Sequence, residues 1–415
     1  MLLSYPYMVF HIGVHLVSLS YFRCSKISVI VGLTIASSTA HASGIFLAEA
    51  SYANMGTGGA GDGVYTENAA AMWTNPATLS FMEQERHTFN TTVLNLDMKY
   101  EDSADVDAFD AHSNKTMPIV SYFSNHNIND KWAYGIALSS RGGAALDYGS
   151  QWKGINQLTD VALVTYQFNP SVAYRLDERV SIAAGLQVDY ALINANTRNL
   201  ELETEDSLAF GYNLGVMFNV SEQTKLGLSY RSQLEHKFSG DTNFKINGST
   251  IRSGHYGAPL ITPATVDISA SYQLNENMTL MSSVQWHDWS KWQDTVVELD
   301  YPNANPYTIN REFKDVWHFG VGGEYKLSNN WAVKAGYSYE TSPLDDAANQ
   351  SPDLPVGEQH RYSVGVSKAW GQHTLDIYYQ YADFGEMDVE QTNKTINLNG
   401  QFVGQVHFIG VGYTF

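Results

Sequence analysis

The sequence of 415 residues has almost no cysteine, since Cys24 is the only one. It lies in a segment that we expect to be removed on export, so the mature chain would have no thiol for a disulfide, a redox reaction or a metal. A lipoprotein leader ending at Cys24 is disfavoured, because Phe22 and Arg23 stand where small residues are expected. The 13 histidines form no HExxH motif or close repeat. The sequence therefore predicts no metal and no cofactor.

Long hydrophobic runs and positive charge are also scarce. No apolar run of about 20 residues occurs after residue 42, which excludes a helical membrane protein. Charged residues make up 16% of the chain, and 43 acidic residues outnumber 24 basic ones to give a net charge of −19. This charge argues against a nucleic-acid partner, because phosphate binding needs a basic surface.

Aromatic residues and glycine are abundant, with 26 Tyr, 18 Phe, 9 Trp and 33 Gly. This composition favours a transmembrane β-barrel. The strands of such a barrel point alternately to lipid and to a polar interior, so that they are only moderately hydrophobic on average.

The N-terminus has the pattern of a secretory signal. Basic Arg23 and Lys26 precede an apolar stretch that ends in small residues at Ala42. We therefore predict that residues 1–42 are a signal peptide cleaved after Ala42, which implies export. Residues 1–22 add a second apolar stretch ahead of the basic residues, so we expect the true start site to lie downstream of Met1.

From residue 86 onward, stretches of about ten alternating residues are separated by short polar turns and longer polar loops. Six short turns separate seven hairpins, which predicts an all-β fold, a transmembrane antiparallel barrel of 14 strands over residues 85–415 with its short turns in the periplasm. The six turns are Asn127 to Asp130, Asp177-Glu178, Ser221 to Gln223, Asn275 to Asn277, Ser328 to Asn330 and Gly371-Gln372.

The alternation also predicts which side chains face the lumen. In residues 331–340 the large apolar side chains share one face, and the small or charged ones share the other. By the same parity four cations face inward, where the carboxylate of a ligand could pair with them. The alternative is that they belong to ion-pair networks of the wall. The four are Arg141, Arg231, Lys334 and Arg361, and Arg198 near the outer end of the fifth strand is a weaker candidate.

The last seven residues alternate apolar and other side chains and end in Phe415, which resembles the C-terminal signal of outer-membrane barrels. We expect the barrel assembly machinery to bind this end. A monomer in the outer membrane, among its lipids and lipopolysaccharide, is the predicted state. Tryptophans near strand ends are expected to lie in interfacial belts, and these are Trp286, Trp289, Trp292, Trp317 and Trp370.

Residues 43–84 do not alternate. They contain a glycine-rich stretch at 56–63 and a predicted short helix at Asn68–Trp73, which ends before Asn75-Pro76-Ala77. A phosphate-binding loop is disfavoured because no Gly-Lys-Ser/Thr follows. A barrel of about 14 strands is too wide for its own side chains to fill, so we expect this segment to be a hatch inside the lumen. Its residues Phe46, Leu47, Met55 and Trp73 could line a ligand site or pack against the wall.

A resemblance to a known family rests on segments spread over residues 43–415. They are Ser43-Gly44-Ile45-Phe46-Leu47, Asn75-Pro76-Ala77, Gly211 to Val216, Leu226 to Ser232, Pro263 to Val266, Ala270 to Leu274, Ser342-Pro343-Leu344, Leu354-Pro355 and His360-Arg361-Tyr362. Together they resemble the FadL-like outer-membrane transport proteins, which include long-chain fatty acid and aromatic-hydrocarbon channels.

The resemblance implies a 14-stranded barrel plugged by its N-terminus. Such a barrel takes hydrophobic molecules from outside by passive diffusion and releases them sideways at a kink in the third strand, which here spans about residues 131–148. The sequence has Gly142-Gly143-Ala144-Ala145 at that place, and glycine within a strand often marks a bend. The alternative is that these glycines only relieve crowding.

Two other classes remain as alternatives. An open porin for small polar solutes would also be a barrel with a charged lumen, but a hatch would obstruct its pore. An outer-membrane lipid enzyme would need a nucleophile beside a histidine and an acid, and no serine could be placed as the partner of His287-Asp288, which an interfacial turn explains better. A hydrophobic-compound transporter is therefore favoured, with a fatty acid as the cargo because of the lumen cations.

Overall fold

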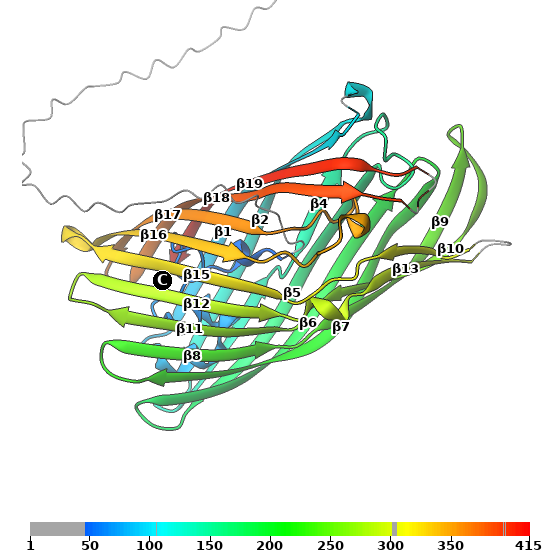
Figure 1. The fold of residues 1–415 in the computed structure, drawn as a ribbon. Helices are drawn as coiled ribbons and strands as arrows, with labels where there is room; N and C mark the ends of the chain where they lie inside the picture. Colours follow the sequence, from blue (N-terminus) through cyan, green and yellow to red (C-terminus); the bar gives the residue numbers. More distant parts are fainter. Residues whose placement is uncertain (1–45, 105, 301–304, 393, 395) are drawn as a thin grey trace, which may run out of the picture. The chain divides into compact units, whose positions relative to one another are not determined.

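A computed structural model describes residues 46–104, 106–300, 305–392, 394 and 396–415, so the predicted signal peptide and residues 43–45 lie outside the described part. The strands form one antiparallel sheet that closes on itself (Figure 1). Closure is made by β1 (Arg86–Asp102), which pairs with β19 (Asn399–Thr414). A closed sheet leaves no unpaired strand edge in a bilayer. None of the helices among the described residues is long and apolar enough to cross a membrane.

The sheet has 19 strand segments, but five barrel strands are each interrupted once, and the barrel therefore has 14 strands, as the turn count predicts. The uninterrupted strands besides β1 and β19 are β2 (Ala111–Asn127), β5 (Asp160–Arg175), β6 (Val180–Asn196), β7 (Leu200–Asn219), β16 (Trp331–Glu340), β17 (Gln359–Trp370) and β18 (His373–Glu390). The interrupted ones are β3 (Trp132–Ser139) with β4 (Gly143–Asp147), β8 (Thr224–Arg231) with β9 (Leu234–Ile246), β10 (Ser249–Thr262) with β11 (Thr265–Gln273), β12 (Met278–His287) with β13 (Asp294–Asp300), and β14 (Tyr307–Asn310) with β15 (Val316–Lys326).

The predicted alternation holds along the strands. In β16, Trp331 and Val333 are exposed on the outer wall, whereas Ala332 and Lys334 are buried on the inner wall. All six predicted short turns join consecutive barrel strands. The large apolar side chains on the outside are those that a bilayer would cover.

The prediction for two tryptophans is wrong. Trp317 and Trp370 are exposed on the wall, but Trp289 and Trp292 are 0% and 2% exposed. The wall is interrupted between β12 and β13 by the 3-10 helix η5 (Trp289–Lys291). This turn leaves the strand alternation, so parity along the strand no longer decides where its side chains point, and both rings pack inward.

The N-terminal segment (residues 46–85) is enclosed by the strands and is drawn in blue in Figure 1. It consists of η1 (Ala48–Ala50), η2 (Asp62–Val64), α1 (Ala71–Thr74) and η3 (Pro76–Phe81), joined by turns. The predicted helix at Asn68–Trp73 is wrong in extent. It begins only at Ala71, because the Asn68 side chain accepts a hydrogen bond from the Ala70 N–H and holds a turn there.

Asn75 fastens the segment to the wall. Its Oδ1 accepts from the Ala77 N–H and caps η3, which has Pro76 at its first position. Its Nδ2 donates to the carbonyls of Gly63 and Val216, and Val216 is on β7. The Asn75 side chain lies so close to Gly215 that a Cβ there would be 2.1 Å from Asn75 Oδ1. The predicted Asn75-Pro76-Ala77 motif is thus a contact between the segment and the barrel.

The third barrel strand leaves a gap in the wall. Its first part, β3, pairs with β2 only along Tyr122–Asn127, and its second part, β4, pairs with β5. Among the described residues β2 and β4 share no ladder. At its β3 end, the wall gap is bounded by a 2.8 Å hydrogen bond between the Ser121 and Ser139 hydroxyls. At its other end, it is bounded by the Asp147 N–H at the end of β4, which donates to Ser113 Oγ. These limits are about 27 Å apart along β2.

Candidate functional site

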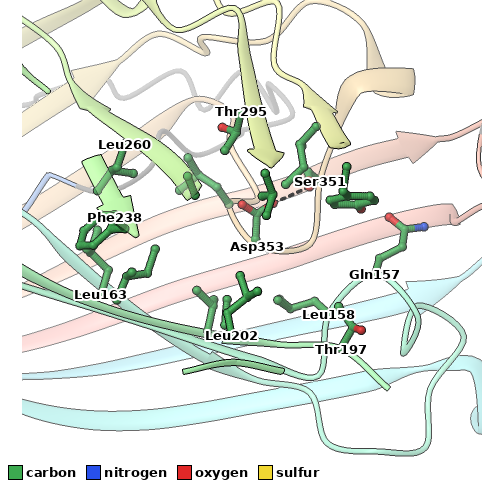
Figure 2. Close-up of a pocket in the computed structure, with 18 of the residues that line it drawn as sticks. Gln157, Leu158, Leu163, Thr197, Leu202, Phe238, Leu260, Thr295, Ser351 and Asp353 are labelled. Atoms are coloured by element: carbon green, nitrogen blue, oxygen red, sulfur yellow. Dashed lines mark hydrogen bonds between the residues drawn. The ribbon is translucent and has the colours of Figure 1, made fainter. Parts of the chain in front are cut away.

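An apolar cavity of about 130 Å³ lies inside the barrel and is lined mainly by β5, β6, β7, β9, β10, β13 and β14 (Figure 2). Figure 2 shows Leu163, Phe238 and Leu260 at one end and Leu158 and Thr197 at the other. Hydrophobic side chains dominate the lining, so a hydrophobic ligand would be removed from water there with little desolvation of polar protein groups. They include Val161, Leu163, Ile193, Leu202, Phe238, Ala258, Leu260, Trp292, Val297 and Ile309.

The charged side chains that line this cavity neutralise each other. Arg311 is 2% exposed and donates from Nη1 and Nη2 to the two carboxylate oxygens of Asp353, at 3.2 and 2.6 Å. Its guanidinium also lies over the Trp292 ring, 5.1 Å from the centroid. Burial would raise the pKa of Asp353, but the ion pair with Arg311 holds that pKa below its usual value. The pair therefore adds no net charge to the cavity.

A second, polar cavity of about 110 Å³ contains three of the predicted cations, Arg141, Arg231 and Arg361. Its other walls come from the N-terminal segment, including Phe46 and Trp73, and from inward-facing polar residues of the strands. Two histidines and three acids also line it, and these are His287, His318, Asp62, Asp267 and Glu340.

Arg141 spans the interruptions of three barrel strands. It lies between β3 and β4, and it donates to the carbonyl of Ser232, between β8 and β9, and to the carbonyl of Pro263, between β10 and β11. Carbonyls at a strand break lack a ladder partner, and a buried carbonyl needs one. The interruptions therefore supply neutral acceptors for a buried guanidinium.

Arg231 is held in the same way. Its guanidinium donates to the side-chain oxygens of Gln167, Asn169 and Gln187 and to the Trp73 carbonyl, at 2.6 to 3.0 Å. It also lies 4.4 Å from the centroid of the Trp73 ring. Every one of these acceptors is neutral.

Arg141 and Arg231 thus form a buried cationic pair without a counter-ion. They are 5% and 7% exposed, and both donate to Gln187 Oε1. Neither makes an ion pair with any described residue. Asp189 is the acid whose charge acts on both, but it accepts a hydrogen bond from Gln167 Nε2 and lies 3.1 Å from His236 Nε2. Burying a charge without an opposite charge is costly. The pair is therefore suited to receive an anion.

The other predicted cations differ from this pair. Lys334 is 2.7 Å from Asp376 and 3.8 Å from Glu324, and it lines neither cavity. Arg198 is exposed in the turn between β6 and β7 and lines neither cavity. Arg361 lines the polar cavity but is paired with acids, Glu49 at 3.2 Å and Glu340 at 3.7 Å.

A small chamber of about 50 Å³ lies beside the wall gap. Met117 of β2 and Gly143 of β4 line it, together with Ala144, which also lines the apolar cavity. Phe46 and Leu47 line both this gap chamber and the polar cavity. The gap chamber is therefore the place where both cavities and the wall gap come together.

Phe46 and Leu47 are fixed to the strand interruption. Phe46 forms an isolated antiparallel bridge with Gly142, and the Leu47 N–H donates to the Arg141 carbonyl at 3.3 Å. The Phe46 ring makes an edge contact with Trp289, at 5.7 Å between centroids. Of the other predicted hatch residues, Trp73 lines the polar cavity, whereas Met55 is fully buried against the wall beside Gly412 and lines none of these three cavities.

Sequence reasoning missed part of this arrangement. It did not anticipate Gln187, the Arg311 and Asp353 pair, or the aromatic wall of Trp289, Trp292 and Phe313. The available signal was the loss of alternation at 288–293 and 311–315, between β12 and β13 and between β14 and β15. Among the described residues, no three His, Cys, Asp or Glu side chains form a group that could hold a metal ion.

Comparisons with known proteins agree with this architecture. The family model described as "Outer membrane protein transport protein (OMPP1/FadL/TodX)" matches residues 33–415. The chain is 21% identical to the long-chain fatty acid transport protein of Escherichia coli strain K12, over 86% of this chain and 91% of that protein. It is also 21% identical to outer membrane protein P1 of Haemophilus influenzae strain KW20, over 90% of this chain and 95% of that protein.

Solved structures show the same fold. A Pseudomonas aeruginosa FadL homologue superposes with a TM-score of 0.82 at 18% identity, covering 90% of this chain and 99% of that one. The Pseudomonas putida toluene transporter TodX gives a TM-score of 0.69 at 16% identity, covering 86% and 96%.

Proposed function

The chain belongs to the outer membrane protein transport protein (OMPP1/FadL/TodX) family, and from this premise we propose that it carries long-chain fatty acids by passive diffusion, with sideways release through the wall gap. It is an outer-membrane transport protein and not an enzyme. Its relatives transport hydrophobic small molecules. The cargo and the route in this chain are the proposal.

The buried pair of Arg141 and Arg231 is the observation that favours a fatty acid as the cargo. Both guanidiniums lack a counter-ion among the described residues, and they line a polar cavity together with Phe46. Phe46 also packs against the buried hydrophobic cluster whose side chains line the apolar cavity. A fatty acid has one anionic head and one apolar tail, and it would satisfy both environments together. Hydrogen bonds to a charged group are worth about 1.5–3 kcal/mol each, and each buried methylene is worth about 0.8 kcal/mol.

The proposed route leaves the lumen sideways. Cargo would pass from the apolar cavity along Ala144 into the gap chamber and then between β2 and β4 into the bilayer. No ladder has to break for this step, because none joins β2 to β4 in the described residues. Passage along the barrel axis would instead displace the N-terminal segment, which is tied to the wall at Asn75 and elsewhere.

In this proposal the N-terminal segment is the hatch. Phe46 and Leu47 close the gap chamber from inside by their contacts with Gly142 and Arg141. Opening the route would require these two residues to leave the strand interruption. An open porin for polar solutes fits less well, because the segment obstructs the axis and the gap chamber is lined mostly by apolar side chains such as Leu94, Met117 and Phe408.

An aromatic hydrocarbon is the second candidate cargo. The apolar cavity has no net charge, and its volume of about 130 Å³ is close to that of an engineered apolar cavity of about 150 Å³ that binds benzene. A small aromatic ring could occupy it without using the arginine pair.

We also propose how the barrel is assembled. Phe415 exchanges backbone hydrogen bonds with His87 at the end of the β1 and β19 ladder, and its side chain is 39% exposed. It would therefore be available to the assembly machinery before the sheet closes. The protein would then act as a monomer surrounded by lipid and lipopolysaccharide.

Uptake by cells tests the cargo. The full chain would be produced in Gram-negative cells that lack their own long-chain fatty acid transporter, where lipopolysaccharide excludes apolar solutes. Entry of a labelled 16-carbon fatty acid, without entry of a disaccharide, is the expected result. Toluene entry without fatty acid entry would keep the route and change the cargo, and disaccharide entry at a similar rate would contradict the proposal in favour of an open porin.

A further inference from the structure

Glu49 is the one acid of η1, and it is buried in the barrel with 1% of its surface exposed. Its Oε1 lies 3.2 Å from Nε of Arg361 on β17 and accepts a 2.6 Å hydrogen bond from Gln380 Nε2. Its Oε2 has no hydrogen-bond partner among the described residues. Half of this buried carboxylate is therefore unsatisfied, so the pair is not an optimised structural contact.

The hydrogen-bonding capacity of Arg361 is also incompletely satisfied. Its second acid, Glu340, is 3.7 Å away and is itself engaged by His318 at 3.1 Å. Arg361 Nη1 has no hydrogen-bond partner among the described residues, although the side chain is only 6% exposed. Arg361 lines both the polar cavity and the gap chamber. An additional anion in either space could therefore form a better pair with it than Glu49 does.

Glu49 is placed where its release would move the hatch. It follows Phe46 and Leu47, whose contacts with Gly142 and Arg141 close the gap chamber. Besides the contacts of its side chain, the Glu49 carbonyl accepts two long hydrogen bonds of 3.4 Å, from the Thr92 and Tyr378 hydroxyls. The ion pair with Arg361 is thus the main charged contact that holds this part of the segment.

We propose that Glu49 is a resident anion which a carboxylate cargo displaces from Arg361, and that this exchange frees Phe46 and Leu47 from the wall gap. No covalent bond changes in this step, because one carboxylate replaces another on the same guanidinium. A neutral molecule of the same length would enter the apolar cavity but would leave Glu49 in place. The channel would therefore select for acids at the opening step as well as by binding. This inference rests on the proposed function.

The test compares a 16-carbon fatty acid with the 16-carbon alcohol in the cell uptake assay. The unmodified chain is expected to admit the acid at least 10-fold faster than the alcohol. Glu49→Gln removes the charge but keeps the shape and an oxygen for Gln380, so it should raise alcohol uptake at least 5-fold while acid uptake is maintained.

Glu67→Gln is the matched control. Glu67 is also an acid of the N-terminal segment paired with a barrel arginine, Arg86 at 3.1 Å, but it is exposed and lines none of the three cavities. This variant should keep the wild-type ratio of acid to alcohol uptake. A heat-dependent shift in gel mobility would show that each barrel has folded.

Three outcomes distinguish failure of the Glu49 exchange from failure of the proposed function. Equal uptake of acid and alcohol by the unmodified chain, or unchanged alcohol uptake in Glu49→Gln, would overturn the exchange and leave the proposed function standing. Entry of neither compound through a folded barrel would overturn the proposed function and the exchange together. A direct readout guards against poor folding of the variant: in the chain with Phe46→Cys and Gly142→Cys, the fatty acid should slow disulfide formation and the alcohol should not.

Discussion

Arg141 and Pro263 are joined by a hydrogen bond of 2.6 Å, in which the guanidinium Nη2 donates to the backbone carbonyl. The two residues stand at interruptions of two different barrel strands, between β3 and β4 and between β10 and β11. The break between β10 and β11 frees the Pro263 carbonyl for this contact, and the break between β3 and β4, where Arg141 lies, opens the wall gap. Arg141 therefore belongs to the proposed head-group site and lies beside the proposed exit.

Arg231→Met should weaken binding of a 16-carbon fatty acid by about 10- to 100-fold, which corresponds to the loss of one charge-assisted hydrogen bond. Binding of the alcohol should not change. Titration of the detergent-solubilised protein would measure both. Arg198→Met, which removes an exposed cation outside the cavities, should leave both affinities unchanged, and equal losses for acid and alcohol in Arg231→Met would contradict a head-group role.

Gly143→Val should reduce fatty acid uptake at least 10-fold. A Cβ at this position would lie 3.0 Å from the Leu163 carbonyl and 3.3 Å from Leu47 Cδ1, so a branched side chain would crowd the gap chamber and the hatch. Gly257→Val is the control, because the added atom would meet nothing within 4 Å. Similar uptake by the two variants would show that the strand interruption is not on the route.

Ala258→Phe should lower the uptake of both the fatty acid and the alcohol, since Ala258 lines the apolar cavity and the larger side chain would fill part of it. Initial uptake rates in cells would measure this effect. The same change at Ala184, on the outer wall of β6, should have no effect. If Ala258→Phe transported normally, the tail would have to lie elsewhere.

Asn75→Ala should lower the free energy that holds the N-terminal segment in place by about 1–3 kcal/mol. The substitution removes the cap of η3 and the two hydrogen bonds that Nδ2 donates to buried carbonyls. Limited proteolysis should then cut within residues 46–82 while the barrel resists. Asn75→Asp keeps the capping oxygen and loses the donors, so it should be intermediate. A segment that stays equally protected in Asn75→Ala would show that other contacts hold it.

Alternation in the sequence predicted the barrel well, because a strand in a closed sheet has only two faces and each residue is assigned by parity. Parity placed Arg231, Lys334 and Arg361 on the inner wall, where they are buried. It failed at Trp289 and Trp292, because the strand ends at His287 and a helical turn follows.

The candidate site could be predicted only in part. Neighbours along the sequence do not reveal that Arg141 reaches carbonyls more than 90 residues away, at Ser232 and Pro263. Nor does the sequence show which inward cations already have acids, as Lys334 has Asp376, and which have only neutral partners. That distinction depends on the register of strands from opposite parts of the chain.

A reversible disulfide between the hatch and the strand interruption is the sharpest test of sideways release past Phe46. Phe46 and Gly142 form an antiparallel bridge, whose Cα atoms are typically about 4.5–5.5 Å apart, a separation that a disulfide can span. The double variant with Phe46→Cys and Gly142→Cys would have no competing thiol once the leader with Cys24 is removed. Oxidation should stop fatty acid uptake and reduction should restore it, while each single cysteine variant should be insensitive to oxidation. Undiminished uptake through the oxidised double variant would contradict sideways release past Phe46.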